Sequence, residues 1–537
     1  MTHPSREGQA LCLASQGKLE EAKSIFIDLV RDGSKSPFVY GNLAMIFGMQ
    51  GNLDAALKFS RQALDLKPDY PEAHNIIGNI QKERGDLASA AGSYKAALAI
   101  RKDYPEAFNN LGVVLNELGN YDAAASAYRR ALSMMPNYAE AHNNLGVTLQ
   151  SNTQIKASIK SFQEALRCNP NYPEALVNLG NSFMQLGEHS AALNAYNQAL
   201  RIRPELQGAQ KTLAIAELLL GDYSKGWQRF EHRFDSDKDF MLHAIPSSSC
   251  TRWHGEVLYP YSKLLVISEQ GIGDILQFMR YIIILRAKGY RVLFCAPPKL
   301  HTLIKESGID ISPITPKQAE SISDGYWVPL LSVPGFVKVS SLNPIIDKPY
   351  ITTTDPLESK WKHILSSHKR PIIGINWQGN PDAEKTSSRG RSLPLEAFAP
   401  IVSRSRVTLL SLQKGFGSEQ LNHCKFRESF VTCQSRVDEA WDFLETAAII
   451  KNCDLIITSD TAVAHLAGGI GMKTWLLLKN TPDWRWGLEG DTTFWYPGMR
   501  LFRKKLYQNW TEMMEYVASE VEQFVHNHST AIDVGSR

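Results

Sequence analysis

The sequence D-L-I-I-T-S-D-T-A-V-A-H-L-A-G-G-I-G, residues 454–471, is the strongest indication of the fold of the C-terminal part of this chain. Residues 455–458 are a short β-branched run typical of a buried strand, and the small apolar residues after Thr461 predict a compact helix that ends at two glycines. A second buried strand is predicted at 474–478. Strand, tight turn, helix and strand in this order predict a parallel α/β unit, which binds ligands at the turns on the carboxyl edge of its sheet.

The turn and the first helical residues of this unit are candidate ligand-binding residues: Asp460, Thr461, Ala462 and His465. Free N–H groups at the start of a helix attract phosphate. The Asp460 carboxylate would repel phosphate, so we expect it to cap the helix or to accept hydrogen bonds from sugar hydroxyls. His465 lies on the same helix face as Thr461 and is tilted towards the ligand end. The alternative is a capped core helix with a satisfied histidine.

Length and composition exclude several classes of protein. A chain of 537 residues needs roughly two to four domains. The net charge of +3 gives no indication of nucleic acid or of an anionic membrane surface. No apolar run reaches the length of a membrane span, and the first residues, MTHPSREGQA, contain no apolar signal core. The seven cysteines form no C-x-x-C pair, which argues against a zinc site and a disulfide framework, so we expect a protein of the reducing cytoplasm. Because no span is predicted, membrane association would be peripheral.

The first 240 residues repeat with a period of 34 residues. The same step separates the tyrosines Tyr70, Tyr104, Tyr138 and Tyr172 and the glycines Gly78, Gly112, Gly146 and Gly180. A further glycine marks the turn inside most repeats, with Thr153 in its place once. This period resembles the tetratricopeptide repeat, in which each unit is a pair of amphipathic helices. The resemblance implies an all-α superhelix over residues 3–240, with a concave face for a protein or peptide partner.

Asparagines recur in the first helix of the repeats, at Asn75, Asn109, Asn143 and Asn178. An asparagine amide both donates and accepts hydrogen bonds, so these residues are candidates for holding the backbone of an extended peptide. The alternative is that they bond between neighbouring repeats. After the last repeat, Trp227 and Phe230 are predicted to seal the array against the next domain.

Residues 241–262 are polar and are predicted to be a linker. Just before them, Asp235, Asp237 and Asp239 match the D-x-D signature of metal-dependent sugar transferases. No buried strand precedes this sequence, so we interpret it as solvated and expect no metal site.

The first α/β half is predicted over residues 263–355. A buried strand at 264–268 leads into a glycine turn with Gly271 and Gly273, and a helix follows. Two glycines let a chain approach a ligand closely. Asp274 then projects at the carboxyl edge of the sheet, where a general base would lie. It could equally serve only as a helix cap.

The second α/β half is predicted over residues 370–505. A strand at 372–377 ends in a turn containing Gly379 and Asn380, and a polar loop follows. The loop contains three cations, Lys385, Arg389 and Arg391. Three cations in a loop beyond a strand suit a diphosphate, and a solvated loop is the alternative. Another predicted strand, 407–412, ends at Gln413.

Five motifs in this part resemble those of bacterial proteins that join tetratricopeptide repeats to a heptosyltransferase-like (glycosyltransferase family 9-like) domain. They are G-I-G-D-I-L-Q-F at 271–278, N-W-Q-G at 376–379, S-L-Q at 411–413, D-T-A-V-A-H-L-A-G at 460–468 and D-W-R-W at 483–486. The resemblance implies a GT-B fold of two Rossmann-like halves, with the acceptor on the first and the donor on the second. It also implies inverting transfer from a nucleotide-diphosphate sugar, with no metal and no other cofactor.

The resemblance implies Asp274 as the catalytic base. The candidate donor site comprises Gly271, Gly273, Gly379, Asn380, Lys385, Arg391, Gln413, Asp460, Thr461, Ala462 and His465. Heptosyltransferases themselves have a lysine and an arginine close together and lack the repeats, whereas here the cations are spread through residues 385–391, so a heptose donor is not implied. Residues 506–530 are expected to form the C-terminal helix that crosses back to the first half in GT-B enzymes.

Two other functions fit the same sequence. The protein could be a repeat scaffold for protein–protein interaction whose transferase domain is inactive. It could also resemble the protein O-linked N-acetylglucosamine transferases, which pair the same repeat type with a GT-B half. The identity of the glycosylated species, protein or glycan lipid, would distinguish the enzymatic alternatives.

Overall fold

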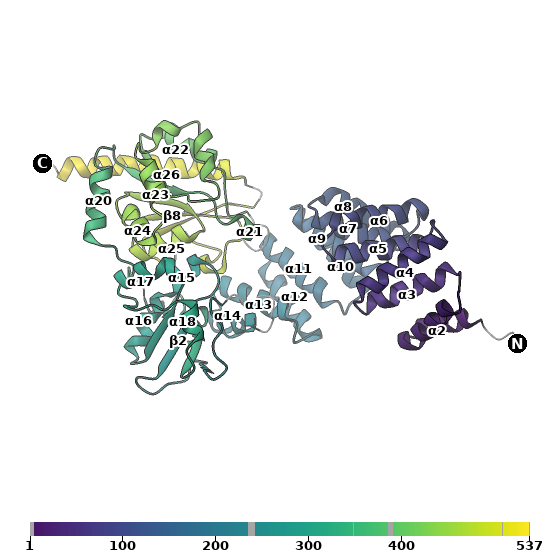
Figure 1. Ribbon diagram of the computed structural model, residues 1–537. Helices are drawn as coiled ribbons and strands as arrows, with labels where there is room; N and C mark the ends of the chain where they lie inside the picture. Colours follow the sequence, from purple (N-terminus) through teal and green to yellow (C-terminus); the bar gives the residue numbers. More distant parts are fainter. Residues whose placement is uncertain (1–4, 235–241, 347, 385–389, 507, 536–537) are drawn as a thin grey trace. The chain divides into compact units, whose positions relative to one another are not determined.

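The computed structural model describes residues 5–234, 242–346, 348–384, 390–506 and 508–535 of the chain (Figure 1). The chain forms two compact units, Met1–Pro204 and Glu205–Arg537, which we call the repeat unit and the α/β unit. None of the helices within the described ranges is long and apolar enough to span a membrane.

The repeat unit is a succession of helix pairs. Its helices are α1 (Arg6–Ser15), α2 (Leu19–Arg31), α3 (Pro37–Met49), α4 (Leu53–Leu66), α5 (Pro71–Glu83), α6 (Leu87–Ile100), α7 (Pro105–Glu117), α8 (Tyr121–Met134), α9 (Ala139–Ser151), α10 (Ile155–Cys168), α11 (Pro173–Leu186) and α12 (His189–Ile202). From α3 onward each pair coincides with one predicted 34-residue repeat, and successive helices pack against each other. The N-terminal all-α superhelix predicted from the sequence is confirmed.

Glycine is favoured inside the repeats at two kinds of position. The turn glycines, such as Gly119, have positive φ angles, which residues with a side chain rarely adopt. Thr153 takes the same position in its repeat with a φ of +60°, so this turn is strained. Helix glycines have the second role: a Cβ on Gly78 would lie 2.6 Å from the Tyr94 ring, so the paired helices can pack this closely only around glycine.

The α/β unit begins with a further helix pair. Its members are α13 (Gln207–Leu219) and α14 (Tyr223–Phe230), followed by the 3-10 helix η1 (Glu231–Phe234). The sequence grouped these residues with the repeats, but they form one compact unit with the two parallel sheets. The reason is the aromatic face of α14: Trp227 donates to the carbonyl of Val339 at 2.9 Å, and both Trp227 and Phe230 pack against Trp484. The prediction that these two aromatic residues seal the helices against the next domain is confirmed.

The first half of the α/β unit is a four-stranded parallel sheet in the order β1-β4-β2-β3. Its elements are β1 (Thr251–Arg252), β2 (Lys263–Ile267), α15 (Ile272–Phe278), α16 (Arg280–Ala287), β3 (Arg291–Cys295), η2 (Pro298–Leu300), α17 (His301–Glu306), α18 (Pro316–Glu320), β4 (Tyr326–Pro329), η3 (Leu330–Ser332) and α19 (Val333–Phe336). The strand predicted at 264–268 is confirmed as β2, whereas β4 was not predicted.

The predicted linker at 241–262 is wrong over its described part. Thr251 and Arg252 form β1, which pairs in parallel with β4 at the edge of the first sheet. The next residue, Trp253, is buried, and its indole donates to the carbonyl of Glu256 at 2.7 Å. This strand could not be predicted from the sequence, because an edge strand of two residues in a polar segment produces no apolar run.

The second half is a five-stranded parallel sheet in the order β6-β5-β7-β8-β9. Its elements are α20 (Asp355–Leu365), β5 (Ile372–Asn376), α21 (Pro381–Glu384), η4 (Leu395–Phe398), α22 (Ala399–Arg404), β6 (Thr408–Ser411), η5 (Ser418–His423), η6 (Arg427–Ser429), α23 (Gln434–Glu439), α24 (Phe443–Lys451), β7 (Leu455–Ser459), α25 (Ala462–Ile470), β8 (Thr474–Leu478), η7 (Trp484–Trp486), β9 (Met499–Arg503) and α26 (Trp510–Gly535). The four predicted strands of this half are confirmed, and β9 is an additional strand. Both halves therefore have the parallel α/β architecture expected from the sequence.

The C-terminal helix α26 packs on the second half, where Figure 1 shows it in yellow beside α22. Its apolar residues Met514, Val517 and Val521 are buried in one core cluster with Ile373 of β5 and Ile457 of β7. The expectation that this helix crosses back to the first half is wrong for its described part. The apolar residues recur at helical spacing and form one face, which the second half covers.

Candidate functional site

Asp274 lies at the carboxyl edge of the first sheet, on the first turn of α15. Strand β2 ends at Ile267, and the chain turns through Gln270, whose φ is +60°, before Gly271 caps the helix. The Gly271 N–H donates to Asp274 Oδ2 at 2.9 Å. The carboxylate thus caps its own helix, and its other oxygen bonds elsewhere.

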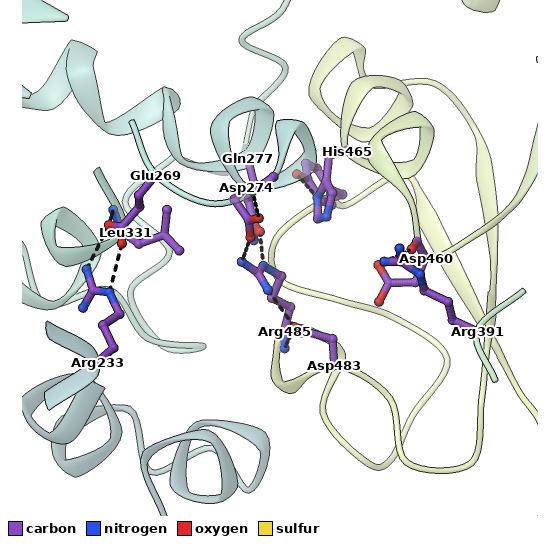
Figure 2. Close-up of polar contacts among 12 residues, drawn as sticks. Arg233, Glu269, Asp274, Gln277, Leu331, Arg391, Asp460, His465, Asp483 and Arg485 are labelled. Atoms are coloured by element: carbon purple, nitrogen blue, oxygen red, sulfur yellow. Dashed lines mark hydrogen bonds and ion pairs between the residues drawn. The ribbon is translucent and has the colours of Figure 1, made fainter. Parts of the chain in front are cut away.

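That other oxygen of Asp274 accepts a hydrogen bond from Arg485 Nη2, on the loop after β8 of the second half (Figure 2). Arg485 also donates to Asp483 Oδ1 at 2.8 Å and to Gln277 Oε1 at 2.5 Å. The Arg485 side chain is 8% exposed and that of Asp274 is 19% exposed. The candidate base is therefore one partner of an ion pair between the two α/β halves.

Burial and the neighbouring charges together set the pKa values of this pair. Loss of water raises the pKa of Asp274 above its ordinary value, and the charge of Asp483 adds to this, whereas Arg485 lowers it. Burial also opposes the charge of Arg485, but Asp483 and Asp274 outweigh this effect and raise the pKa of the guanidinium. Arg485 therefore stays cationic, and Asp274 is a stronger base than an exposed aspartate.

His465 is a buried, neutral side chain of α25. Its Nδ1 lies 2.9 Å from the Tyr496 hydroxyl, and its ring stacks on Trp486 with 5.5 Å between the ring centroids. Burial lowers the pKa of His465 well below its ordinary value, and the charges of Arg485 and two further arginines act in the same direction. These contacts are those of a satisfied core histidine, and the arginines make its surroundings electropositive.

The N-terminal turns of α15 and α25 touch each other at Gly273. A Cβ on Gly273 would lie 2.9 Å from His465 Cδ2 and 3.6 Å from Ala462 Cα. Both turns lie at the carboxyl edges of their parallel sheets. Gly273 thus lets the two halves approach each other, where the sequence predicted the approach of a ligand.

Asp460 and Arg391 meet on the second half. Arg391 Nη1 donates to the main-chain oxygen of Asp460 at 3.2 Å, and Arg391 Nε donates to Glu384 Oε1 at 3.2 Å. The guanidinium covers Gly379, where a Cβ would lie 2.5 Å from Nη2. Burial and the charge of Asp483 raise the pKa of Asp460 to about 6, although a nearby indole and two arginines lower it. Arg391 is therefore a cation that contacts two of the predicted donor-binding turns, those of Gly379 and Asp460.

Gln413 and Thr461 hold the end of β5. Gln413 Oε1 accepts from Asn376 Nδ2 and from the main chain of Gln378, both at 2.9 Å, and its Nε2 donates to the carbonyls of Gln378 and Phe416. Asn376 Oδ1 accepts in turn from Thr461 Oγ1 at 2.8 Å, which ties the start of α25 to β5. Gln413 and Asn376 are buried, and together with Thr461 they position the turn. Asn376 links the two turns, a role that the sequence did not indicate.

Four predicted donor-site residues belong to the loop after β5, namely Gly379, Asn380, Lys385 and Arg391. Lys385, like its neighbour Arg389, lies outside the described residues. Asn380 accepts a hydrogen bond from the Asp382 N–H at 3.0 Å, so it shapes its own turn. Of the three predicted loop cations, Arg391 alone can be placed at the site.

Sequence reasoning missed two cations near the site, Lys479 and Arg485. Burial lowers the pKa of Lys479, while the charges of Asp483 and Asp460 raise it. Lys479 comes directly after the buried strand β8, and Arg485 lies within the D-W-R-W motif a few residues later. Their position after a strand, at the carboxyl edge of the sheet, was the signal that could have found them.

In the repeat unit, asparagines form a ladder between neighbouring repeats. The donor–acceptor pairs are Asn110–Asn75 at 3.1 Å, Asn144–Asn109 at 3.1 Å and Asn178–Asn143 at 3.0 Å. The asparagine side chains therefore form hydrogen bonds between neighbouring repeats, as the alternative interpretation of these residues expected. Peptide binding by Asn75, Asn109, Asn143 and Asn178 stays a prediction.

Among the residues that the structure describes, no group of three or more His, Cys, Asp or Glu side chains is placed to hold a metal ion. The D-x-D sequence at 235–239 lies outside them. A cavity of about 340 Å³ lies at α14 and η1 and is lined by Lys225, Gln228, Arg229 and His232, none of which belongs to the candidate site.

Comparison with protein families supports the repeat assignment. The model of the TPR repeat matches residues 78–119 and 114–152, and models of the tetratricopeptide repeat match residues 39–70, 139–172 and 173–206. The N-terminal part of the chain is a tetratricopeptide-repeat array. Such an array implies a protein or peptide partner.

Similar proteins cover parts of the chain. Protein FlbA from Caulobacter vibrioides (strain ATCC 19089 / CIP 103742 / CB 15) is 26% identical over 327 residues, which is 56% of this chain and 52% of FlbA, so this chain spans about half the length of that relative. The solved structure of YrrB, a TPR protein with an unusual peptide-binding site, is 23% identical and covers 34% of this chain and 95% of its own, with a TM-score of 0.30. PilW, a type IV pilus biogenesis factor, is 22% identical and covers 39% of this chain and 96% of its own, with a TM-score of 0.36.

Proposed function

We propose that the α/β unit is a GT-B-type glycosyltransferase that moves a sugar from a nucleotide-diphosphate sugar to an acceptor recruited by the repeats. One observation carries the proposal. The N-terminal turns of α15 and α25 meet at Gly273, and Asp274 of one half lies beside a cation of the other. The carboxyl edges of parallel sheets are where open α/β folds bind ligands, so a site built from two such edges suits a reaction between a donor and an acceptor.

In the proposed reaction the second half binds the donor. The first N–H groups of α25 and the guanidinium of Arg391 hold the diphosphate, because helix N-termini and arginines both favour phosphate oxygens. The Arg391 side chain is 20% exposed, so a ligand can reach it. Asp460 accepts hydrogen bonds from sugar hydroxyls. Positive charge beside the diphosphate stabilises the negative charge that develops on it as it departs.

The first half activates the acceptor. Asp274 takes the proton of an acceptor hydroxyl while that oxygen bonds to the anomeric carbon and the bond from this carbon to the diphosphate breaks, with inversion. The raised pKa of Asp274 supports this role, because it makes the carboxylate a better proton acceptor. Arg485 has to turn away from Asp274 before the carboxylate can act, and the diphosphate offers it another anionic partner.

The Asp274–Arg485 pair favours a second candidate function. A protein-interaction scaffold with an inactive transferase domain needs no free base, and the Asp274 carboxylate is occupied by Arg485 and by the Gly271 N–H. The repeats imply a protein or peptide partner under either function. An enzyme similar to the protein O-linked N-acetylglucosamine transferases would use the repeats to hold a protein acceptor.

A donor screen with the full chain tests the proposal. A ligand that binds the folded state raises its melting temperature, so UDP-, GDP-, ADP- and dTDP-linked sugars are compared by thermal shift. We expect one of them to raise the Tm of the parent and to have less effect on Arg391→Ala. Arg404→Ala is the matched control, because Arg404 is an exposed arginine of the same half that pairs with Glu515. If none of the sugars shifts the parent, the scaffold function replaces the proposal.

A further inference from the structure

The helix pair α13–α14 contacts both halves of the α/β unit. On the first half, the Trp227 indole donates to the carbonyl of Val339 at 2.9 Å. On the second half, Trp227 packs edge-on against Trp484 with 5.3 Å between ring centroids, and Tyr223 packs edge-on against Phe494 at 5.5 Å. One short helix pair therefore joins the two halves whose turns form the candidate site.

Arg233 lies three residues after the end of α14 and forms buried hydrogen bonds with the first half. Its guanidinium donates through Nε and Nη2 to the two oxygens of Glu269, at 3.1 and 2.9 Å (Figure 2). Nη2 also donates to Ser332 Oγ at 2.8 Å, and Nη1 donates to Phe230 O and Glu231 Oε1 at 2.9 and 3.0 Å. These bonds use all the N–H donors of a guanidinium. The side chains of Arg233 and Glu269 are 5% and 3% exposed.

Glu269 opens the glycine turn that carries Asp274. It directly precedes Gln270, the residue with a φ of +60°, and Gly271, the cap of α15. Its Oε1 also accepts from the main-chain N–H of Leu331 at 2.9 Å. Arg233 therefore fixes the start of this turn, so a displacement of the ion pair would displace the Asp274 carboxylate.

Helix α14 also contacts the surroundings of Arg485, through aromatic side chains. Trp227 packs on Trp484, and Trp484 stacks on Phe278 of α15 with an interplanar angle of 13°. The Arg485 guanidinium lies over Trp484 at 4.5 Å and over Phe278 at 5.2 Å. Trp484 directly precedes Arg485 in the chain, so the packing of the Trp484 indole determines the position of the Arg485 backbone.

We propose that Arg233 and Trp227 are positioning residues of the candidate active site, and that the α13–α14 pair is needed for transferase activity. Arg233 places Asp274 through Glu269, and Trp227 places Arg485 through its neighbour in the chain. The two residues together set the relative position of the base of one half and the cation of the other. The effect on turnover rests on the proposed function, whereas the effect on the glycine turn does not.

The chemistry of the Arg233–Glu269 pair fits positioning better than stabilisation. A buried ion pair loses the hydration of both charges, so well-packed apolar residues of similar volume often stabilise a fold as well or better. Its two parallel hydrogen bonds, in contrast, allow one relative orientation of the groups that they join. An apolar replacement of both residues can therefore keep the fold and lose the alignment of the turn.

The test uses variants of the full chain, with Tm, hydrogen–deuterium exchange of amides 271–279, and kcat and KM for the donor as readouts. Arg233→Lys keeps the charge and loses the paired bonds. Arg233→Met combined with Glu269→Leu removes both charges and leaves neither one buried alone. Arg229→Lys is the matched control, because Arg229 lies on α14 and bonds within the helix pair, to Glu217 and Gln210.

We expect the double variant to keep a Tm close to that of the parent, to exchange faster at 271–279, and to lose kcat by roughly 10- to 100-fold with little change in KM, as for a misplaced catalytic group. Arg233→Lys should show the same changes to a smaller degree, and Arg229→Lys none of them. Parent-like exchange and kcat in Arg233→Lys and in the double variant would overturn the proposal. If the parent transfers no sugar, the proposed function fails, and exchange at 271–279 alone decides whether Arg233 positions the turn.

Discussion

Asp274 and Arg485, one in each half of the α/β unit, form an ion pair across 211 positions of sequence. The pair joins the candidate base to the loop that follows β8. A substitution of either residue therefore changes the surroundings of both, and the acceptor and donor sides of the site are linked through this contact.

Asp274→Asn should lose most of the turnover, typically about 10²–10⁴-fold, because asparagine cannot take the proton of an acceptor hydroxyl. Asparagine keeps the size of the side chain and can still accept the Gly271 N–H, so Tm should stay near that of the parent. Donor affinity should stay equal or increase, since Arg485 loses a competing carboxylate. Transfer rate, calorimetric affinity and Tm measure the three effects.

The control for this variant is Asp460→Asn, which should weaken donor binding instead. Near-normal turnover of Asp274→Asn would mean that Asp274 only caps α15 and that the base lies elsewhere. A Tm far below that of the parent would mean that Asp274 serves the fold.

Asp460 should lower the stability of the α/β unit at neutral pH. Burial raises its pKa from an ordinary value of 3.8 to about 6, so between these values the folded state binds more protons than the unfolded state. The free energy of unfolding therefore falls as the pH rises through this window, by on the order of 3 kcal/mol, and changes no further above it. Asp460→Asn should remove this loss.

The pH dependence of Tm tests this prediction. The gain in Tm from Asp460→Asn should grow as the pH rises from about 4 towards about 6 and level off above that, following the raised pKa. A gain that is the same at every pH would show that Asp460 titrates normally.

Thr153→Gly should stabilise the repeat unit by roughly 1 kcal/mol, because glycine adopts a positive φ without the strain that a side chain causes. Gly119→Thr is the reverse change in another repeat. A Cβ on Gly119 would meet nothing within 4 Å, so this control measures backbone strain alone and should lose a similar amount. Urea unfolding of both variants gives the two differences, and equal stability of Thr153→Gly and the parent would contradict the strain.

A fragment of residues 205–537 should fold and bind the donor, because it contains the whole compact unit. The repeat period alone places the boundary later and suggests that residues 250–537 would suffice. That shorter fragment lacks Arg233 and Trp227, which leaves Glu269 buried without its partner and exposes Trp484. We expect it to melt well below the longer fragment in a thermal scan, and equal melting temperatures would contradict this.

Turnover should be insensitive to EDTA. The motif resemblance implies metal-independent transfer, and the proposed donor site offers Arg391 and the α25 N-terminus to a diphosphate. Rates measured with and without the chelator check this. Activity that EDTA abolishes and magnesium or manganese restores would contradict it.

Much of the fold could be predicted because its signals are local. The 34-residue period fixes the helix pairs of the repeats, and buried apolar runs mark β2, β5, β7 and β8. The short edge strand β1 could not be found in this way, because it has no apolar run and exists only through its pairing with β4. The assignment of α13–α14 likewise depends on the residues that their aromatic face packs against.

The site was predictable in part for the same reason. Asp274 and Asp460 follow buried strands in tight turns, so a strand–turn–helix pattern is enough to place them at carboxyl edges. Gln413 was predicted to bind the donor, but its amide is buried among main-chain groups, and only the packing of the 376–379 turn determines this. The same holds for Gly273, whose missing side chain makes room for His465.

The repeat array, the two parallel α/β halves and the turns that carry Asp274 and Asp460 follow from the amino-acid sequence, because residues close together in the chain set the periodicity and the strand–turn–helix order. Three further features depend on tertiary packing: Asp274 pairs with Arg485, Arg233 binds Glu269, and the helix pair α13–α14 belongs to the α/β unit. These contacts join residues far apart in the chain, and their charges can be buried only where the fold brings a partner within hydrogen-bond distance.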